Sequence, residues 1–345
     1  MVSVSIVIPT LNSASVLDAC LSSIAIQDYP KQSMEILVVD GGSKDTTLEM
    51  AAAYQVTILK NPLQTGEAAK AVGYHYASHD IVAFIDSDNI LPHSQWLKNM
   101  LIPFEQSDIC ASEPWAFLYR KGDYVITRYC ALLGMNDPLC HFLGNYDRWN
   151  FLTGKWTACN VSCEDRTSYL AVQFQENQIP TIGANGFFIR KKYLNELPIK
   201  DYFFDVDVIP RLVAKLGKER VTVAKVKESI GHLYCRKFSD FYHKQSRRIR
   251  DFLYLASCEQ RFHSPKSVAK IRIFYFVMCC FFIFPLFFQS FKGYFKKKDM
   301  AWFFHPVACW MTLGVYGMHV IRAWIFGVSQ PYSRAHWQNI SSRKN

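Results

Sequence analysis

Short apolar runs alternate with segments of helical periodicity along the first hundred residues. The predicted strands are runs rich in Val, Ile and Leu, at 4–8, 34–39, 56–60 and 81–85. The predicted helices lie between them, at 14–26, 46–54 and 67–77. Strands and helices that alternate in this way form a parallel sheet with helical crossovers. The pattern therefore predicts an α/β fold with a mostly parallel sheet.

The pattern loosens between about residues 103 and 180, where aromatic residues such as Trp149 and Trp156 gather. This stretch is longer than an ordinary connection. Two interpretations stay open for an insertion at about 120–180: a functional segment over the active site, or a surface subdomain with its own small core. Regular elements return after it, with a strand at 187–190, a helix at 208–216 and a strand at 221–226.

Two long apolar stretches lie near the end of the chain, at about 271–291 and 301–321. Each is about long enough to cross the hydrocarbon core of a bilayer, and Trp, Tyr and Lys flank them. The lysines between them, at 292–298, oppose two spans because positive charge favours the cytosolic side. Two arrangements stay open: two spans, which the lengths favour, or two helices that dip in and return, with Pro285 breaking the first.

The formal net charge of +10 is concentrated between Arg236 and Lys298. Basic residues beside apolar segments fit an anionic membrane surface or a diphosphate, and no nucleic-acid-binding motif accompanies them. We therefore expect membrane lipids, and no nucleic acid, among the partners. Eleven cysteines form no C-x-x-C pair, which favours reduced, buried thiols over a zinc site. Residues 1–8 alternate like a strand without a basic leading region, so no signal peptide is expected.

Short segments that contain polar residues follow three of the predicted strands at the point where each strand ends. They are Pro9, Thr10 and Asn12 after the first strand, Asp40, Gly41 and Gly42 after the second, and Asp86, Ser87 and Asp88 after the fourth. The carboxyl ends of parallel strands meet at one edge of a sheet, where open α/β proteins bind ligands. Two carboxylates separated by one residue can hold a divalent cation, which can neutralise a diphosphate.

Taken together, three motifs closely resemble those of the family 2 glycosyltransferases with the GT-A fold. They are Ser5-Ile6-Val7-Ile8-Pro9-Thr10-Leu11-Asn12, Val38-Val39-Asp40-Gly41-Gly42-Ser43-Lys44-Asp45-Thr46-Thr47 and Phe84-Ile85-Asp86-Ser87-Asp88-Asn89, in the family's order and spacing. The resemblance covers roughly residues 1–250 and implies a GT-A (Rossmann-like) nucleotide-sugar-binding domain. Its nucleotide-binding half would be 1–100 and its acceptor half 101–250, followed by a basic linker and membrane-attachment region at 251–345.

The resemblance assigns the donor nucleotide to the first half of this domain. Asp40 would hydrogen-bond the nucleobase, and the alternative is that it caps the helix that follows Gly42. Gly41 and Gly42 would let the backbone approach the ligand. The same cleft would be lined by Pro9, Thr10 and Asn12.

The Asp86-Ser87-Asp88 segment corresponds to the family's metal and diphosphate motif. By resemblance, Asp88 is the more direct ligand of Mg²⁺ or Mn²⁺, and Asp86 lies nearer the ribose. His232 is a further candidate ligand, although a lone histidine is more often structural. The family often has Arg-Asn where this chain has Lys70-Ala71. A lysine can pair with phosphate but lacks a bidentate fork, which weakens a donor-binding role for Lys70.

Two later motifs carry the remaining candidate residues. Asp205 aligns with the family's catalytic base and Asp207 with a supporting acid, and the alternative is a pair that caps the following helix. Asn185, in a glycine-rich turn, is expected near the donor sugar, unless the turn only leads into the next strand. Arg247 and Arg248 are similar to part of the Gln-x-x-Arg-Trp motif of processive relatives, without the Trp. They would clamp diphosphate or form a basic, membrane-facing helix.

These features predict a membrane-attached, metal-dependent, inverting glycosyltransferase. It would move a sugar from a nucleotide-sugar donor, expected to be UDP-linked, to a lipid-linked or glycan acceptor near the membrane. The catalytic domain would face the cytosol, where nucleotide sugars are found. The alternative enzyme is a polyprenyl-phosphate sugar synthase, whose acceptor phosphate needs no strong base. An alternative of another class is an inactive GT-A scaffold of a glycan-assembly complex.

Overall fold

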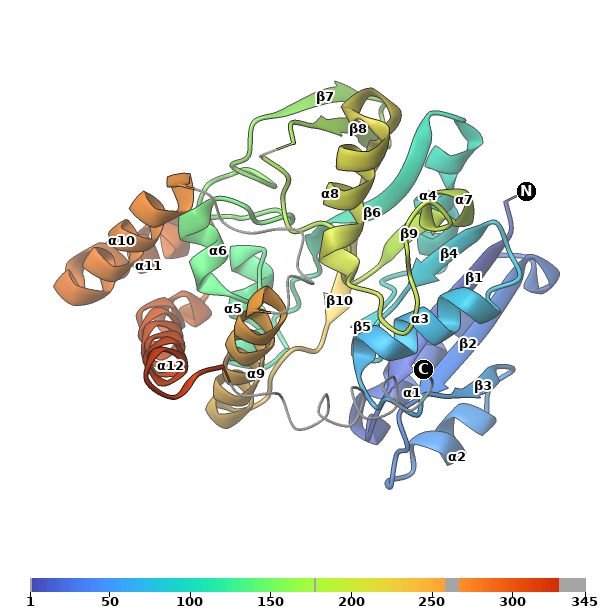
Figure 1. Ribbon diagram of the computed structural model, residues 1–345, viewed down its shortest axis with the longest axis horizontal. Helices are drawn as coiled ribbons and strands as arrows, with labels where there is room; N and C mark the ends of the chain where they lie inside the picture. Colours follow the sequence, from blue (N-terminus) through green and yellow to red (C-terminus); the bar gives the residue numbers. More distant parts are fainter. Residues whose placement is uncertain (1, 177, 258–266, 329–345) are drawn as a thin grey trace. The chain divides into compact units, whose positions relative to one another are not determined.

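The computed structural model describes residues 2–176, 178–257 and 267–328 of the 345-residue chain (Figure 1). The described part divides into two compact units. The first joins the residues up to Leu118 with Asn160–His232, and the second joins Tyr119–Cys159 with the described residues from Leu233 onward. The first unit therefore ends before the domain boundary expected at residue 250. Part of the expected region at 251–345 lies outside the described residues.

A mixed β-sheet forms the centre of the first unit. Its strands are β1 (Val4–Thr10), β2 (Met34–Asp40), β3 (Thr57–Lys60), β4 (Ile81–Phe84), β5 (Asn89–Ile90), β6 (Ile109–Phe117), β7 (Val161–Asp165), β8 (Tyr169–Phe174), β9 (Phe187–Arg190) and β10 (Thr222–His232). The order is β3-β2-β1-β4-β9-β6-β10-β8-β7, and β5 pairs with β10. Neighbours from β3 to β4 are parallel, as are β6 and β10, whereas β9 is antiparallel to both of its neighbours.

The helices of the first unit include those predicted at 14–26, 46–54, 67–77 and 208–216, together with short helices that the sequence pattern did not indicate. They are α1 (Ala14–Ala25), α2 (Thr47–Ala52), α3 (Gly66–Tyr76), α4 (Trp96–Leu101), α7 (Lys191–Leu194) and α8 (Asp205–Leu216), with short 3-10 turns at η1 (Lys31–Ser33), η2 (Ile102–Glu105) and η3 (Lys218–Arg220). The alternation of strand and helix predicted over the first hundred residues is confirmed. The central strands β1 and β4 are apolar because they are buried: Val4, Ile6 and Phe84 have no exposed surface.

Helix α3 lies unusually close to the sheet because Gly73 has no side chain. A Cβ atom placed on Gly73 would lie 2.2 Å from Cγ1 of Val7 in β1, closer than any real carbon contact. The helix carries Lys70 one turn earlier, and Lys70 is buried. The small residue at 73 thus allows the close packing that brings the Lys70 side chain to the sheet edge.

The second unit is helical. Its elements are α5 (Val125–Leu133), α6 (Pro138–Leu143), α9 (Phe238–Ser257), α10 (Ser267–Phe282), α11 (Phe284–Lys296), η4 (Met300–Phe304) and α12 (His305–Phe326). Tyr129 and Leu133 from α5 share one apolar core with Phe241 and Trp302. The stretch at 119–159 therefore packs with the later helices of the second unit, whereas the later part of the expected insertion, from residue 160, supplies β7 and β8 of the sheet.

The apolar stretch at 271–291 is not one straight helix. Helices α10 and α11 meet at a bend of 93°, where Ile283 has φ +61° and Pro285 is in the first turn of α11. The proline ring and the positive φ explain the break, because neither fits a continuous helix. No single helix in the described part is long and apolar enough to cross a membrane, although this bent pair passes by length and composition. The expectation of two spanning helices at 271–291 and 301–321 is therefore not supported.

We expect Gly73→Ala to destabilise the protein by about 1–2 kcal/mol, because the added methyl group overpacks against Val7. Gly66→Ala is the matched control on the same helix, since nothing lies within 4 Å of a Cβ at that position. That control should be neutral or stabilising by up to ~1 kcal/mol, as Ala is a better helix former than Gly. Urea unfolding of both variants measures the difference. Equal unfolding midpoints for the two variants would contradict the close packing of α3.

Candidate functional site

The polar groups that follow β1, β2 and β4 lie at the same edge of the sheet in the first unit. Parallel pairing places Thr10 opposite Asp40, and Val7 opposite Phe84, so the three strand ends are neighbours. Pro9 is half-buried within β1. The polar edge of the sheet that the sequence predicts is therefore present.

The carboxylate of Asp40 is occupied by its own turn. One oxygen, Oδ2, accepts the backbone N–H groups of Gly42 and Ser43, at 2.8 and 2.9 Å. The other, Oδ1, accepts the hydroxyls of Ser43 at 2.5 Å and Thr10 at 3.2 Å. A carboxylate has about four acceptor positions. These contacts support a role for Asp40 in shaping the turn, and nucleobase recognition by Asp40 stays a prediction.

The loop after β1 is built into the same turn. Asn12 has φ +51°, and its Oδ1 accepts the N–H of Lys44 at 2.8 Å. Its own N–H donates to Oγ of Ser43 at 2.8 Å. Gly41 lies so close to the neighbouring loop that a Cβ would be 3.3 Å from Cα of Gln64. Asn12 and Gly41 therefore hold two loops together, and their contact with a nucleotide stays a prediction.

Lys70 joins two acidic motifs that are far apart in sequence. Its Nζ lies 2.6 Å from Oδ2 of Asp205 and 3.1 Å from Oδ1 of Asp86, and its side chain is only 7% exposed. Burial alone would lower the pKa of Lys70, but the charges of Asp205 and Asp86 outweigh it and raise the pKa well above its usual value. Lys70 therefore carries a positive charge between two carboxylates. The ion pairs of Lys70 with Asp86 and Asp205 were not visible in the sequence, and a donor-binding role for Lys70 stays a prediction.

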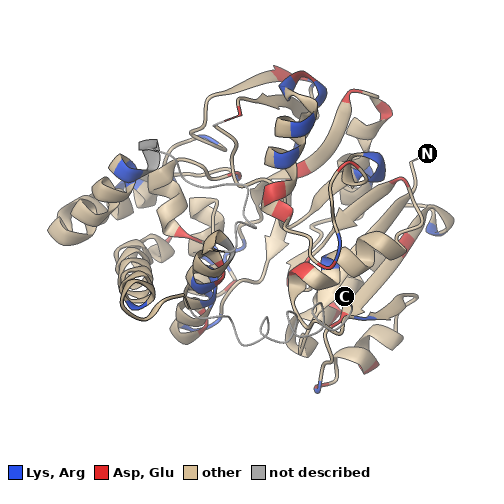
Figure 2. Cartoon of the chain, in the orientation of Figure 1, with Lys and Arg blue, Asp and Glu red and all other residues tan. Residues whose placement is uncertain are grey.

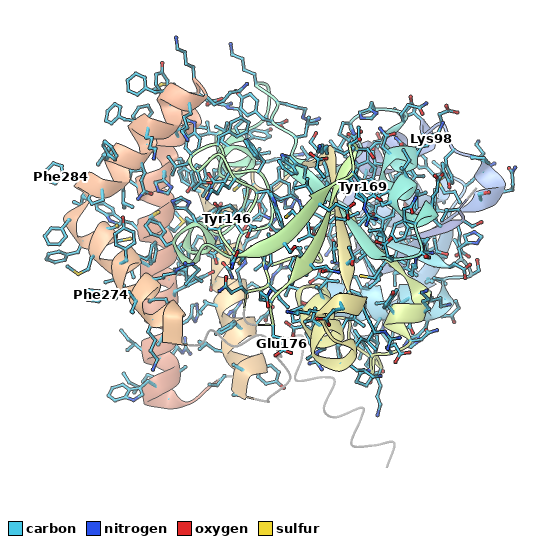
Figure 3. All side chains as sticks on the ribbon, turned by 90° about the horizontal axis from the view of Figure 1, so that it is seen from above. Lys98, Tyr146, Tyr169, Glu176, Phe274 and Phe284 are labelled. Carbon is cyan, nitrogen blue, oxygen red and sulfur yellow. The ribbon has the colours of Figure 1, made fainter. Side chains whose placement is uncertain are left out.

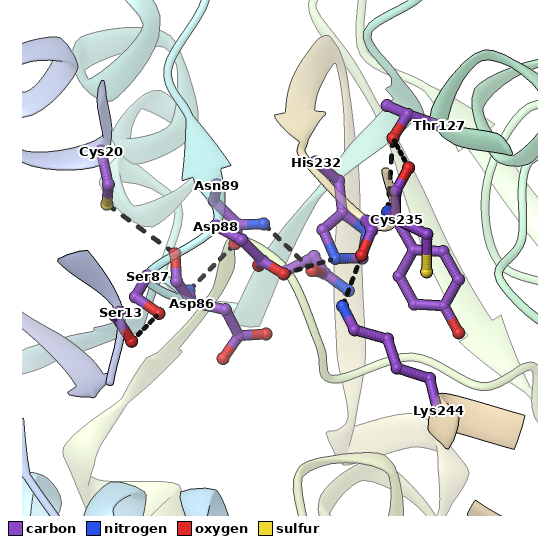
Figure 4. A network of polar contacts seen from close by, with 12 residues as sticks. Ser13, Cys20, Asp86, Ser87, Asp88, Asn89, Thr127, His232, Cys235 and Lys244 are labelled. Atoms are coloured by element: carbon purple, nitrogen blue, oxygen red, sulfur yellow. Dashed lines mark hydrogen bonds and ion pairs between the residues drawn. The ribbon is translucent and has the colours of Figure 1, made fainter. Parts of the chain in front are cut away.

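Asp88 lies beside His232, as the sequence analysis suggested for a shared cation site (Figure 4). Nε2 of His232 is 3.4 Å from Oδ2 of Asp88, and the two side chains are 9% and 21% exposed. The strand pairing explains the approach, because the short β5 that follows the motif pairs with β10 and sets Asn89 opposite His232. A carboxylate and an imidazole of this kind can serve as two ligands of one cation.

The donor set fits Mg²⁺ or Mn²⁺ if the substrate completes the coordination. Among the described residues no group of three or more His, Cys, Asp or Glu side chains could hold a metal. Such ions are commonly bound through one or two protein carboxylates, with water and substrate phosphates supplying the remaining oxygens. Carboxylate and water oxygens are the ligands that suit Mg²⁺ and Mn²⁺ best. The pair formed by Asp88 and His232 fits this pattern, whereas Asp86 is bound to Lys70.

Asn89 is a buried link that the sequence analysis missed. Its Oδ1 accepts the N–H of Asp86 at 2.9 Å, and its Nδ2 donates to Oδ1 of Asn185 at 3.0 Å (Figure 4). Asn185 is 9% exposed and has φ +55°. One amide thus connects the acidic turn after β4 with the glycine-rich turn before β9. Its place directly after the Asp-x-Asp motif was the available signal.

A second feature that the sequence did not reveal is a buried ion pair below the glycine-rich turn. Nζ of Lys225 in β10 lies 2.7 Å from Oε2 of Glu113 in β6, and neither side chain is exposed. Oε1 of Glu113 accepts the N–H of Gly183 at 2.9 Å. A Cβ on Gly183 would lie 2.2 Å from the carbonyl oxygen of Asp205. The ion pair therefore fixes the turn on which the start of α8 rests.

Asp205 and Asp207 differ sharply in accessibility. Asp205 begins α8 and is 19% exposed on its side chain, whereas Asp207, two residues later, is fully buried. The N-cap position is Phe204, which makes no side-chain cap, so neither acid is the N-cap. Both carboxylates lie in the first turn, where the helix dipole favours negative charge. Of the two, Asp205 is the one that can meet a substrate.

Arg247 and Arg248 lie on α9 in the second unit. Arg247 is exposed. Nη1 of Arg248 donates to Oε1 of Gln245 at 2.9 Å and to the carbonyl oxygen of Asn136 at 3.4 Å. These contacts give Arg248 a structural role within its unit. A clamp on diphosphate by either arginine stays a prediction.

Relatives of this chain are known glycosyltransferases. Residues 5–157 match the family model "Glycosyl transferase family 2". Glycosyltransferase AglE of Haloferax volcanii is 38% identical over 139 residues, which are 38% of this chain and 45% of AglE. The Escherichia coli UDP-Glc:alpha-D-GlcNAc-diphosphoundecaprenol beta-1,3-glucosyltransferase WfgD is 32% identical over 136 residues, which are 38% of this chain and 49% of WfgD. The chain thus spans less than half the length of these two relatives.

Two solved structures show a broad likeness. Glucosyl-3-phosphoglycerate synthase from Mycobacterium tuberculosis, in complex with Mn²⁺, UDP and glucosyl-3-phosphoglycerate, has a TM-score of 0.48 at 19% identity and covers 77% of this chain and 82% of that one. Mannosyltransferase PcManGT from Pyrobaculum calidifontis, in complex with GDP-Man and Mn²⁺, has a TM-score of 0.47 at 14% identity. The match covers 99% of this chain and 80% of that one. TM-scores this low carry no conclusion about activity.

The sequence match covers the first strands of the sheet and the residues at their carboxyl ends. It includes the turn after β2, Lys70 on α3 and the Asp86-Ser87-Asp88 motif after β4. Motif, spacing and strand position agree with the match of residues 5–157 to the glycosyl transferase family 2 model.

Proposed function

We propose that the chain is an inverting, metal-dependent glycosyltransferase with a GT-A catalytic domain. It transfers a sugar from a nucleotide-sugar donor, UDP-linked, to a lipid-linked or membrane-proximal acceptor in glycan or glycolipid assembly. The observation that carries the proposal is Lys70, whose ammonium holds Asp86 and Asp205 within 3.1 and 2.6 Å. This contact joins the proposed donor site to the proposed base.

Each of several residues at this edge has its own role in an in-line displacement at the anomeric carbon of the donor sugar. The carboxylate of Asp205 accepts the proton as the acceptor oxygen attacks the anomeric carbon. The bond from that carbon to the diphosphate breaks, and its electron pair leaves with the diphosphate. A cation held by Asp88 and His232 would offset charge on the leaving group when bound. Lys70 holds the Asp205 carboxylate in position, and its fixed charge lies beside the donor site.

The acceptor class is supported by the named relatives. WfgD carries in its name a UDP-glucose donor and a diphosphoundecaprenol-linked acceptor. An acceptor of this kind lies at a membrane, and a donor nucleotide sugar is cytosolic, so the catalytic unit would face the cytosol. The test is to incubate membranes that contain the full chain with a panel of labelled nucleotide sugars, followed by lipid extraction. Label in the lipid fraction that depends on this chain supports the proposal.

The same assay separates the alternatives. A product that is a polyprenyl phosphate carrying one sugar would identify a polyprenyl-phosphate sugar synthase. An absence of both transfer and donor hydrolysis with every nucleotide sugar would identify an inactive scaffold. A labelled product in which the sugar joins an existing glycan hydroxyl supports the proposed reaction.

Asp88→Ala should abolish transfer and the response to added Mn²⁺ while the fold survives. The reason is that this partly exposed acid contributes little to packing but would hold the cation. Transfer is measured across a Mn²⁺ titration. Glu49→Ala, which removes an exposed acid on α2, is the matched control and should behave like wild type. Full turnover by the wild-type enzyme in excess chelator would rule out the metal hypothesis.

Asp205→Asn should lower turnover by about 10²–10⁴-fold while donor binding stays near normal, because an amide keeps the shape but cannot accept the proton. Turnover and donor affinity are measured separately. Asp201→Asn, at an exposed acid just before α8, is the control. If Asp207→Asn is inactive and Asp205→Asn is active, the base is assigned to the wrong acid. If neither variant loses activity, the synthase alternative is favoured.

Lys70→Met should lower the unfolding free energy by about 1–3 kcal/mol, because it leaves two carboxylates without their shared cation. The pKa of Lys70 is raised in the folded state. Its contribution is therefore complete below the unfolded pKa of about 10.4 and is lost only as the pH rises through the higher folded value. The stability difference from wild type, measured by urea unfolding, should be equal at pH 7 and pH 9. A difference that disappears by pH 9, or an equal loss in Lys60→Met, would contradict the ion pair.

A further inference from the structure

The bent pair of α10 and α11 in the second unit has the features of a surface that enters a membrane from one side. We propose that this elbow inserts into one leaflet of an anionic bilayer and returns, without crossing it. The surface of the elbow thus binds the lipids of one leaflet. This inference does not depend on the transfer chemistry proposed for the first unit.

The dimensions of the elbow favour entry into one leaflet. Helix α10 has 16 residues and α11 has 13, which gives lengths of about 24 and 20 Å at 1.5 Å per residue. The hydrocarbon core of a bilayer is about 30 Å thick. Because the two helices meet at 93°, they cannot both follow the bilayer normal. A short path into the bilayer and back fits this geometry.

The outward face of the elbow is aromatic. On α11 it follows helical spacing through Phe284, Phe288, Phe291 and Phe295, which are 84%, 69%, 48% and 77% exposed. On α10 the exposed residues include Ile271, Phe274, Tyr275, Phe281 and Phe282. Figure 3 shows Phe274 and Phe284 pointing away from the helices. Aromatic surface of this extent is unusual for a protein face that meets only water.

The inward face of α11 is already used for packing. Leu286, Ser290 and Gly293 are buried along it. A Cβ on Gly293 would lie 2.4 Å from the ring of Trp302, so the helix rests directly on that indole. The aromatic face is therefore the side of α11 that the second unit leaves uncovered.

The backbone at the break is suited to an apolar medium. The N–H of Ile283 donates to the carbonyl of Cys279 at 3.1 Å, and the N–H groups of Leu286 and Phe287 donate to the carbonyl of Ile283 at 2.9 and 3.3 Å. Pro285 has no N–H to satisfy. Lipid cannot hydrogen-bond these groups, so internal partners at a bend are what insertion requires.

Charge identifies the partner as an anionic leaflet. Residues 273–291 carry no charge, whereas Lys270 and Arg272 precede this segment and Lys292 and 296–298 follow it. In Figure 2 the part of the elbow nearest its bend is tan, the colour of uncharged residues. Lysines at both ends meet headgroups on the same side when the elbow enters and returns, which removes the conflict with the positive-inside tendency. A second copy of the chain would instead bring like charges together.

The first test is flotation of the full-length protein with vesicles of phosphatidylcholine and phosphatidylglycerol in equal parts. Wild type should float with the vesicles, and the double variant Phe281→Asp/Phe284→Asp should lose at least ~10-fold of the bound fraction. Ile26→Asp, which places the same charge at an exposed apolar position of the first unit, should float like wild type. Circular dichroism checks that each variant is folded.

A charge variant keeps the test informative if the double variant does not fold. Lys292→Glu/Lys298→Glu should weaken flotation with the mixed vesicles but not with pure phosphatidylcholine. Equal flotation of wild type and both variants overturns the proposal. So does a dimer in the absence of lipid that the Phe281→Asp/Phe284→Asp change dissociates, because the surface would then be a protein interface.

Topology is tested with single cysteines in a background without other reactive thiols. Lys270→Cys and Lys297→Cys lie at opposite ends of the elbow and should both be protected from an impermeant thiol reagent until the cells are opened. Labelling of only one of them in intact cells means that the pair crosses the bilayer and overturns the proposal. Transfer activity in detergent is measured in parallel, so a failure of the anchor is distinguishable from a failure of the catalytic proposal.

Discussion

Two carboxylates at one sheet edge repel each other unless a positive charge lies between them, and Lys70 supplies that charge. Asp86 follows β4 and Asp205 begins α8, more than a hundred residues later, yet both contact one ammonium. The helix that carries Lys70 must lie close to the sheet for this to happen, and Gly73 permits it. The two carboxylates at this edge thus depend on the charge of Lys70, and Lys70 reaches them only because its helix packs closely on the sheet.

Other buried polar groups near this edge of the first unit are also hydrogen-bonded or paired with an opposite charge. Asn89 ties the acidic turn to the glycine-rich turn, and the buried pair of Glu113 and Lys225 supports that turn from below. Buried polar groups are tolerated when they are hydrogen-bonded or paired, and these bonds also fix geometry. These bonds hold the acidic turn and the glycine-rich turn in one arrangement, which would reduce the cost of ordering the edge if it binds a substrate.

Local pattern was sufficient to predict the alternating strands and helices from β1 to β4, because their apolar periodicity reflects packing in the sheet, but it did not indicate β5 or α4. The acids at 40, 86, 88 and 205 could be named as candidates because each lies at or near the end or start of an element, and their roles stay predictions. The contacts of Lys70, Asn89 and Glu113 were not, because each depends on a partner distant in the chain. The division into units could not be seen either, as residues 119–159 pack with helices more than eighty residues away. Hydropathy alone did not show how sharply the chain turns at Ile283.

Strand β9 enters the sheet antiparallel to β4, with Phe187 opposite Phe84 and Ile189 opposite Val82. Because of this direction, the turn that carries Asn185 begins at the very edge where β4 ends. A slip of the register by two residues would move that turn by about 7 Å along the strand. The apolar side chains of β9 therefore determine where a polar turn is presented. The place of Asn185 beside the acidic turn after β4 is thus set by the fully buried side chains of Phe187, Phe188 and Ile189.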